Sequence, residues 1–186
     1  DGIHVRVATA EGPATDVIAR DAAVSVGFAA LRRDAVLEVA FATIGAPYGW
    51  GGRGGGRDCS QLLRDVLVPF GVALPRHSSL QALAGTRTIE VDAMTSEQKL
   101  AAIAAAAQDG LVLLYMPGHI MLDLGEREGR RWAISAISEY LEPCPTGGDT
   151  LRRLDRVAVT DLELGRDSAR GAFIERITRL AVIGDG

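Results

Sequence analysis

The 186-residue chain has little cysteine, no block of positive charge and no long apolar run. It contains 2 cysteines, and its 20 Lys and Arg against 24 Asp and Glu give a net charge of −4. Two distant cysteines do not form a disulfide framework, and an acidic chain without a basic block is a poor nucleic-acid binder. No apolar run reaches the length that crosses a bilayer. We therefore expect no nucleic-acid partner and no membrane span, while the oligomeric state stays open.

The remaining composition is that of one globular domain. Hydrophobic residues make up 47% and charged residues 24%, which is ordinary for a soluble protein. The length suffices for one well-cored domain, and no repeat or low-complexity tract divides it. Residues 1–33 alternate only weakly, as a lead-in strand or coil. We predict an N-terminal lead-in segment or linker over 1–33 and one domain over 34–186.

The spacing of apolar residues changes half-way along the chain. Helical spacing predicts helices within 32–46, 59–68 and 95–108, the last with Thr95 and Gln98 at capping-box spacing. After residue 110 the period becomes two, as in strands. The predicted strands cover 111–116, 119–126, 130–138, 155–164 and 171–183. Helices followed by an antiparallel sheet indicate the α+β class, with helices packed on one face of the sheet.

One cysteine stands at the predicted start of a helix, behind six glycines, in "YGWGGRGGGRDCSQLL". Asp58 is a good N-cap and Gln61 follows at capping-box spacing, so Cys59 takes the first helical position. The helix dipole there favours a thiolate, which is the nucleophilic form, and glycines let a substrate backbone approach. A phosphate-binding loop would instead end in Lys-Ser or Lys-Thr. The alternative for Cys59 is a small buried hydrophobe.

The other cysteine, Cys144, lies in the loop-like "EPCPTGG" with no metal-ligand or redox spacing around it, and we interpret it as incidental. Among the three histidines, His119 opens a predicted strand, and it could take the proton from the thiol. His4 is interpreted as a surface residue and His77 as a loop residue. The alternative for His119 is an ordinary histidine with a satisfied hydrogen bond.

The hairpin after His119 allows a register to be predicted. If its turn is centred on Arg127, Leu122 pairs with Trp132 and Asp123 with Arg131. His119 then faces Ser135, whose hydroxyl could hold the imidazole in orientation.

Four stretches, "PYGWGG", "RDCSQLL", "FGVALPRHSSLQ" and "MPGHIMLDLG", closely resemble the NlpC/P60 family of cysteine peptidases. The resemblance implies a reduced papain-like fold, in which N-terminal helices, one with the cysteine at its N-terminus, pack on an antiparallel sheet. It also implies cleavage of bacterial peptidoglycan stem peptides between γ-D-glutamate and a diamino acid, without cofactor or metal. The expected location is the cell envelope or the exterior, with cytoplasmic muropeptide recycling as the alternative.

The resemblance also assigns expected roles. It makes Cys59 the nucleophile, His119 the base, and Tyr48 a contact of the substrate or the oxyanion. Asp58 and Ser60 flank the thiol, with Asp58 expected to meet a free substrate amine.

Two further residues are expected at the substrate. Trp50 would form a pocket wall and Ser78 would contact the substrate. Each assigned residue also has a structural alternative: Asp58 as a cap, Tyr48 and Trp50 as core, and Ser78 as a turn cap.

The sequence departs from the family at the third catalytic position, where Ser135 stands in place of the usual His. One interpretation keeps a working Cys–His pair that Ser135 or a water orients. In a second interpretation, Glu139 reaches into the site and takes the third catalytic position, although strand alternation does not favour this. A third is a muropeptide-binding module that has lost hydrolysis. The second departure is that residues 1–33 hold no complete SH3-like domain. We favour the peptidase.

Overall fold

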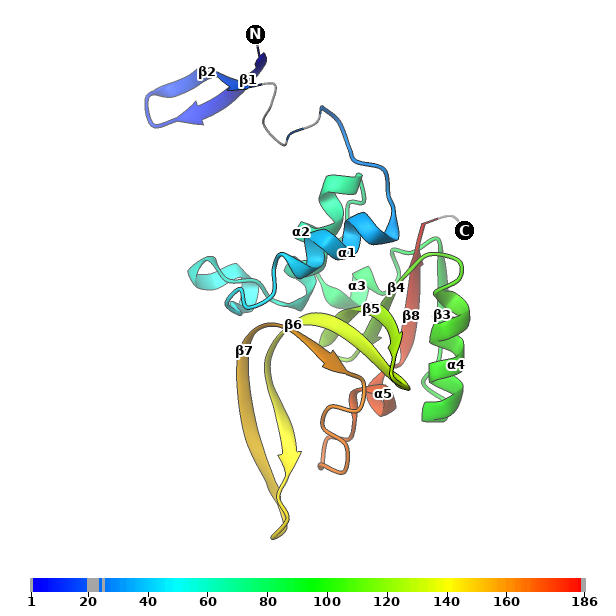
Figure 1. Cartoon of the computed structure of the whole chain (residues 1–186). Helices are drawn as coiled ribbons and strands as arrows, with labels where there is room; N and C mark the ends of the chain where they lie inside the picture. The colour runs from blue at the N-terminus through cyan, green and yellow to red at the C-terminus, as the bar shows by residue number, and fades with distance from the viewer. Residues whose placement is uncertain (1, 20–23, 25, 185–186) are drawn as a thin grey trace.

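The computed structural model describes residues 2–19, 24 and 26–184. A six-stranded sheet with strand order β3-β8-β4-β5-β6-β7 is antiparallel throughout and forms the centre of the molecule (Figure 1). Its strands are β3 (Arg87–Glu90), β4 (Leu111–Met116), β5 (His119–Arg127), β6 (Arg130–Pro143), β7 (Asp149–Asp161) and β8 (Arg179–Ile183). The helices are α1 (Arg33–Phe41), α2 (Cys59–Leu67), α3 (Ser78–Gln81), α4 (Ser96–Ala106) and α5 (Phe173–Arg176), with short 3-10 helices η1 (Trp50–Gly55) and η2 (Val68–Phe70). The α+β class is confirmed.

Helices cover both faces of the sheet, not one face as the sequence predicts. Along β4 the side chains alternate: Leu111 and Leu113 join the core under α1 and α2, while Val112 and Leu114 join the core under α4 and α5. A strand that is buried on both faces becomes a continuous apolar run, as "LVLLYM" is. Two cores therefore meet at the sheet, and a side chain's position in a strand decides which one it enters.

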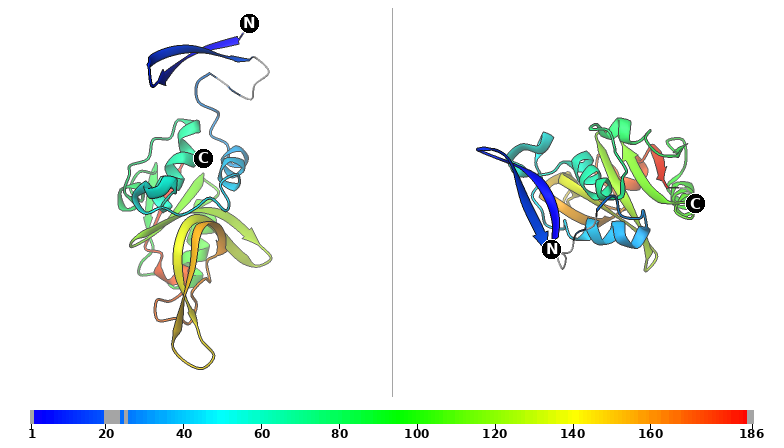
Figure 2. Two further views of the ribbon diagram at one scale, coloured as in Figure 1. Left: turned by 90° about the vertical axis from the view of Figure 1, so that its left-hand side faces the viewer. Right: turned by 90° about the horizontal axis from the view of Figure 1, so that it is seen from above.

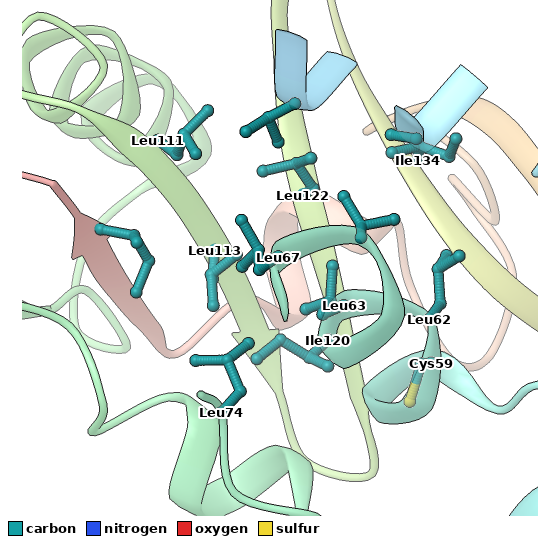
Figure 3. Close-up of a cluster of buried hydrophobic side chains, with 14 of the residues drawn as sticks. Cys59, Leu62, Leu63, Leu67, Leu74, Leu111, Leu113, Ile120, Leu122 and Ile134 are labelled. Atoms are coloured by element: carbon teal, nitrogen blue, oxygen red, sulfur yellow. The ribbon is translucent and has the colours of Figure 1, made fainter. Parts of the chain in front are cut away.

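The α2 helix is held to the sheet by one apolar face (Figure 3). Its apolar residues lie at helical spacing and are at most 1% exposed. They pack on Leu113, Ile120 and Leu122. The helix residues concerned are Leu62, Leu63, Val66 and Leu67. This packing fixes where the mouth of α2, and with it Cys59, meets the start of β5.

The predicted register of the β5–β6 hairpin is wrong. The turn residues are Glu128 and Gly129, with φ of 55° and 72°, as a two-residue hairpin turn requires. Leu122 pairs with Ile134, not with Trp132. The reason is a bulge between Asp123 and Gly125 together with the shifted turn.

The bulge keeps the predicted faces in spite of the changed register. At Leu122 and Asp123, before the bulge, the error is two residues, and a shift of two leaves these side chains on their predicted faces. Asp123 lies opposite Ala133 in the ladder, not opposite Arg131. The Arg131 guanidinium nevertheless donates to both Asp123 carboxylate oxygens, at 2.8 Å each.

Other element predictions hold to different degrees. The helices within 32–46, 59–68 and 95–108 are confirmed, and the Thr95–Gln98 capping box is present. The segment 171–183, predicted as one strand, contains α5 before β8 because Glu175 accepts from the Ala172 amide and starts a helical turn. The edge strand β3 was not predicted, since its four residues include three polar ones. The β6–β7 hairpin extends beyond the rest of the sheet (Figure 2).

The N-terminal segment contains a hairpin, β1 (Gly2–Thr9) with β2 (Gly12–Ala19), in a two-stranded sheet of its own. No residue of this hairpin is buried. Part of the weakly alternating stretch 22–31 lies outside the described residues. The boundary at residue 33 stays a prediction. Within the part of the chain that the structure describes, no helix has the length and apolarity needed to span a membrane.

The buried Asp123–Arg131 pair leads to a stability prediction. Asp123 is fully buried and Arg131 is 8% exposed. Asp123→Asn should lower the free energy of unfolding by about 3–5 kcal/mol, because it leaves a buried guanidinium without its counter-charge. Denaturant unfolding measures this change. The control is Asp109→Asn, which breaks an exposed pair with Arg87 and should cost no more than about 1 kcal/mol. Equal losses in both variants would contradict the prediction.

Candidate active site

The glycine-rich loop before Cys59 folds tightly on itself. The Arg57 amide donates to the Pro47 carbonyl and the Gly49 amide to the Arg57 carbonyl, each at 3.1 Å, which closes the base of the loop. A Cβ at Gly49 would lie 2.3 Å from the Arg53 carbonyl oxygen, and one at Gly56 would lie 2.7 Å from the Gly49 nitrogen. Glycine is therefore required at both positions by the loop's own backbone.

Cys59 is the first residue of α2, as predicted, and its side chain belongs to the core under that helix. Only 8% of the residue is exposed. Burial raises the pKa of the thiol, and the charge of Asp58 adds to this effect; the amides of Ile120, Ser60 and Cys59 itself act in the opposite direction. The raised pKa thus opposes the thiolate that the sequence predicts at Cys59. The helix entrance does favour a thiolate, but burial outweighs it.

Asp58 is an N-cap, as predicted, and it is also the centre of a polar network. One carboxylate oxygen accepts from the Gln61 amide at 2.9 Å and the Ser60 hydroxyl at 3.0 Å, while the other accepts from the Gly51 amide at 3.0 Å. Arg76 forms a two-point ion pair with the same carboxylate. Burial alone would raise the pKa of Asp58, yet the bonds from Arg76, Gln61 and Ser60 outweigh it and lower that pKa.

Arg76 is a site residue that sequence reasoning missed. Its guanidinium also donates to the Ser60 hydroxyl at 2.6 Å. The "LPR" segment that carries it is tied to α2 by Gln81, whose amide nitrogen donates to the carbonyls of Ser60 and Pro75 at 2.8 Å. The only signal in the sequence was its place beside Ser78 in the stretch that resembles the family.

His119 is half-buried at the start of β5 and meets the predicted partner. Its Nε2 lies 3.1 Å from the Ser135 hydroxyl oxygen, and its ring centre lies 5.8 Å from that of Phe173. Burial and the nearby charge of Arg176 lower the pKa of His119 to about 4. The imidazole is therefore neutral at pH 7, as a general base must be.

The thiol and the imidazole line two adjoining pockets. One, of about 340 Å³, is lined by Cys59 together with Asp58, Ser60, Arg76 and Ser78. The other, of about 190 Å³, is lined by His119. Both pockets share Tyr48, Trp50 and Gly118. Among the described residues, no hydrogen bond joins the Cys59 sulfur to the His119 ring; the sulfur faces the amide of Ile120, the next residue along β5.

Two aromatic residues, Tyr48 and Trp50, line both pockets. Tyr48 is fixed by its amide, which donates to the Asp155 carbonyl at 2.9 Å, and it packs partly against the core. Burial and the charges of Cys59 and Asp58 raise the pKa of its hydroxyl, so it stays a proton donor. Trp50 is 68% exposed, and it therefore forms a pocket wall and not part of the core.

The His119 pocket also contains Glu139, a position that regular strand alternation does not favour. A register shift between Ile137 and Glu139 interrupts the alternation of β6, and Glu139 lines the pocket as a result.

His4 lies on β1 and His77 lines the thiol pocket. Cys144 lies just after β6, with its sulfur 2.8 Å from the Thr150 hydroxyl. No cluster of three metal-ligating side chains occurs within the described ranges.

Comparison with known proteins decides the family. The model of the NlpC/P60 family matches residues 45–138, which is half of the chain and includes Cys59, His119 and Ser135. The chain belongs to the NlpC/P60 family. The probable endopeptidases Rv2190c of Mycobacterium tuberculosis and Mb2213c of Mycobacterium bovis are each 53% identical to it over 53 residues, or 28% of this chain and 13% of theirs.

Solved NlpC/P60 structures share the fold. The NlpC/P60 endopeptidase of Photobacterium damselae subsp. piscicida is similar with a TM-score of 0.72 and 18% identity, over 97% of this chain and 46% of that one. An NlpC/P60 family protein of Bacillus cereus ATCC 10987 gives a TM-score of 0.54 and 16% identity, over 97% and 50%. The chain thus spans about half the length of these solved relatives.

The lowered pKa of His119 leads to a pH prediction for this NlpC/P60 protein. Because the folded state disfavours the imidazolium, stability should be full above pH 6.5 and should fall as the pH drops from 6.5 to about 4. The loss assigned to this group reaches up to about 3 kcal/mol. Denaturant unfolding across this range measures it, with His119→Gln as the reference. The variant should lack this component; identical pH slopes in both proteins would contradict the prediction.

Proposed function

We propose that the protein is a cysteine endopeptidase that hydrolyses bacterial peptidoglycan stem peptides, at the bond between γ-D-glutamate and a diamino acid. One observation carries the proposal: a thiol at a helix N-terminus and a neutral, hydrogen-bonded imidazole line adjoining pockets in an NlpC/P60 protein. These are the groups that nucleophilic acyl transfer needs. Family membership supports the substrate class, and the names of the endopeptidase relatives support the reaction.

The electrostatics of the free site favour general-base catalysis over a preformed ion pair. The thiol and the imidazole are both neutral before substrate binds. His119 takes the thiol proton as the Cys59 sulfur attacks the carbonyl carbon, and then gives it to the leaving amine. A thioester remains on Cys59, and water hydrolyses it with His119 again as the base. Substrate binding draws the two groups together, since catalytic hydrogen bonds are often long in free enzymes.

The developing negative charge on the substrate oxygen needs donors near the sulfur. The free amides in the first turn of α2 face Cys59, and the Tyr48 hydroxyl remains protonated beside them. We assign both to this role.

Substrate contacts on the acyl side come from the thiol pocket. Trp50 and Ser78 form part of its wall, and Ser60 lies under it, 5% exposed. Asp58 was expected to meet a free substrate amine. Because Arg76 already balances its charge, we propose that Asp58 mainly organises the mouth of α2 and contributes less charge to the recognition of an amine.

The proposed partner is a peptidoglycan stem peptide or muropeptide, and the proposed location is the bacterial envelope or the exterior. Ser135 favours a second candidate, a muropeptide-binding module with impaired hydrolysis, because a hydroxyl polarises an imidazole less than a carboxylate does.

A digestion experiment separates the two candidates. Muropeptides incubated with the wild type should yield fragments cut after γ-D-glutamate, detected by mass spectrometry. Cys59→Ala should give no more fragments than buffer alone, because it lacks the nucleophile, while the control Cys144→Ala should digest like the wild type. Absence of fragments together with muropeptide binding by calorimetry would instead establish the binding module.

The role of Ser135 can be tested separately. Ser135→Ala should lower kcat/KM about 5- to 150-fold, because loss of a buried hydrogen-bond partner costs about 1–3 kcal/mol. KM should change little, since Ser135 acts through His119. Steady-state hydrolysis of a synthetic stem peptide gives both constants. Ser168→Ala, which removes a hydroxyl bonded to the Gly165 carbonyl, is the control. An unchanged rate in Ser135→Ala would exclude Ser135 as the group that orients the imidazole.

A further inference from the structure

The pocket beside His119 carries an excess of positive charge. Arg170, Arg176 and Glu139 all line it. Arg170 pairs with Glu139 at 3.6 Å. Arg176 makes no ion pair with any residue that the structure describes, and its guanidinium carbon lies 5.8 Å from the centre of the Phe173 ring. One arginine charge of this pocket is therefore left without a counter-ion.

The short helix that carries Arg176 is anchored firmly. The buried Lys99 donates to the Glu175 carbonyl at 2.7 Å, and Glu175 accepts from the Ala172 amide at 2.8 Å. The adjacent residues Phe173 and Ile174 are buried in the core under α4 and α5. Arg176 thus projects into the pocket from a rigid support, as binding sites require.

The surroundings of Arg176 favour the binding of an anion to its guanidinium. Burial and the like charge of Arg170 lower its pKa, which means that both destabilise the unpaired cation. A carboxylate relieves this cost through a planar, two-point contact. The Arg176 charge also lowers the pKa of His119, so an anion bound to it would raise that pKa.

The chemistry of acyl transfer decides which part of a substrate enters this pocket. The acyl group stays on the Cys59 sulfur, while the amine leaves after His119 protonates it. In the proposed reaction the leaving amine lies beside His119, so the pocket that His119 lines is the one next to the leaving residue.

We propose that Arg176, assisted by Arg170, binds a free carboxylate on the leaving residue, so that the protein selects diamino acids with a side-chain carboxylate. This inference rests on the proposed function. It adds the residue that recognises the leaving part of the substrate. Arg176 is then a specificity residue, and bound substrate makes His119 a stronger base by neutralising the charge near it.

Two synthetic γ-D-glutamyl peptides test the selectivity. They differ only in the leaving residue, diaminopimelate or lysine, and both have amidated C-termini, so that the side-chain carboxylate is the single difference. The wild type should show a kcat/KM for the diaminopimelate peptide about 10- to 100-fold above that for the lysine peptide, as expected for a charge-assisted hydrogen bond. Arg176→Gln should bring the ratio close to one, Arg176→Lys should retain part of it, and the exposed control Arg153→Gln should keep it.

A binding measurement separates this subsite from the proposed hydrolysis. Free diaminopimelate is titrated into Cys59→Ala, and the His119 ring is followed by NMR. The ligand should bind and raise the pKa of His119, and the addition of Arg176→Gln should abolish both effects, with unchanged melting temperature as the folding control. Binding without hydrolysis of either peptide would support the subsite and overturn the proposed function. Hydrolysis of both peptides at equal rates, or no Arg176-dependent binding, would overturn the subsite.

Discussion

The Asp58 carboxylate is the interaction on which the candidate site depends. It caps α2, holds the glycine-rich loop through Gly51, and pairs with Arg76 from the segment before α3. Three stretches of chain are thereby joined at the residue next to the thiol. Asp58 is only 8% exposed. A buried carboxylate keeps its charge only when hydrogen bonds and a counter-ion compensate for the lost water, and the partners named above do so. The position of Cys59 follows from this network and from the packing of α2 on the sheet.

Burial determines the protonation states around that network. It raises the pKa of the Cys59 thiol and lowers that of the His119 imidazole. Both shifts disfavour charge, so the Cys59 thiol and the His119 imidazole form no ion pair with each other in the free site. In the reaction that we propose, the proton therefore moves from the thiol to the imidazole only when the sulfur attacks. A hydroxyl at Ser135 suits such a site better than it would suit an imidazolium, because it has no charge of its own with which to stabilise one.

The two pockets differ in their balance of charge. The thiol pocket contains a balanced Asp58–Arg76 pair, whereas Arg176 in the His119 pocket forms no ion pair with any residue in the described part of the chain. The unbalanced charge of the candidate site is therefore concentrated in the His119 pocket, which we assign to the leaving side of the bond. The β6–β7 hairpin contributes to this side through Glu139, whose direction results from an irregularity in strand pairing.

What the sequence by itself determined is local. Capping by Asp58, the apolar stripe of α2 and the Thr95–Gln98 box involve residues within a few positions of each other, and short-range periodicity suffices to predict them. The motifs around Cys59 and His119 also sufficed to indicate the family. The tertiary structure alone decided the remainder: the Asp58–Arg76 pair, the hairpin register with its bulge, the charge state of the thiol, and Arg176 beside His119. Each of these depends on burial or on contacts between distant segments, and no spacing along the chain reports the dielectric environment or the neighbours that folding supplies.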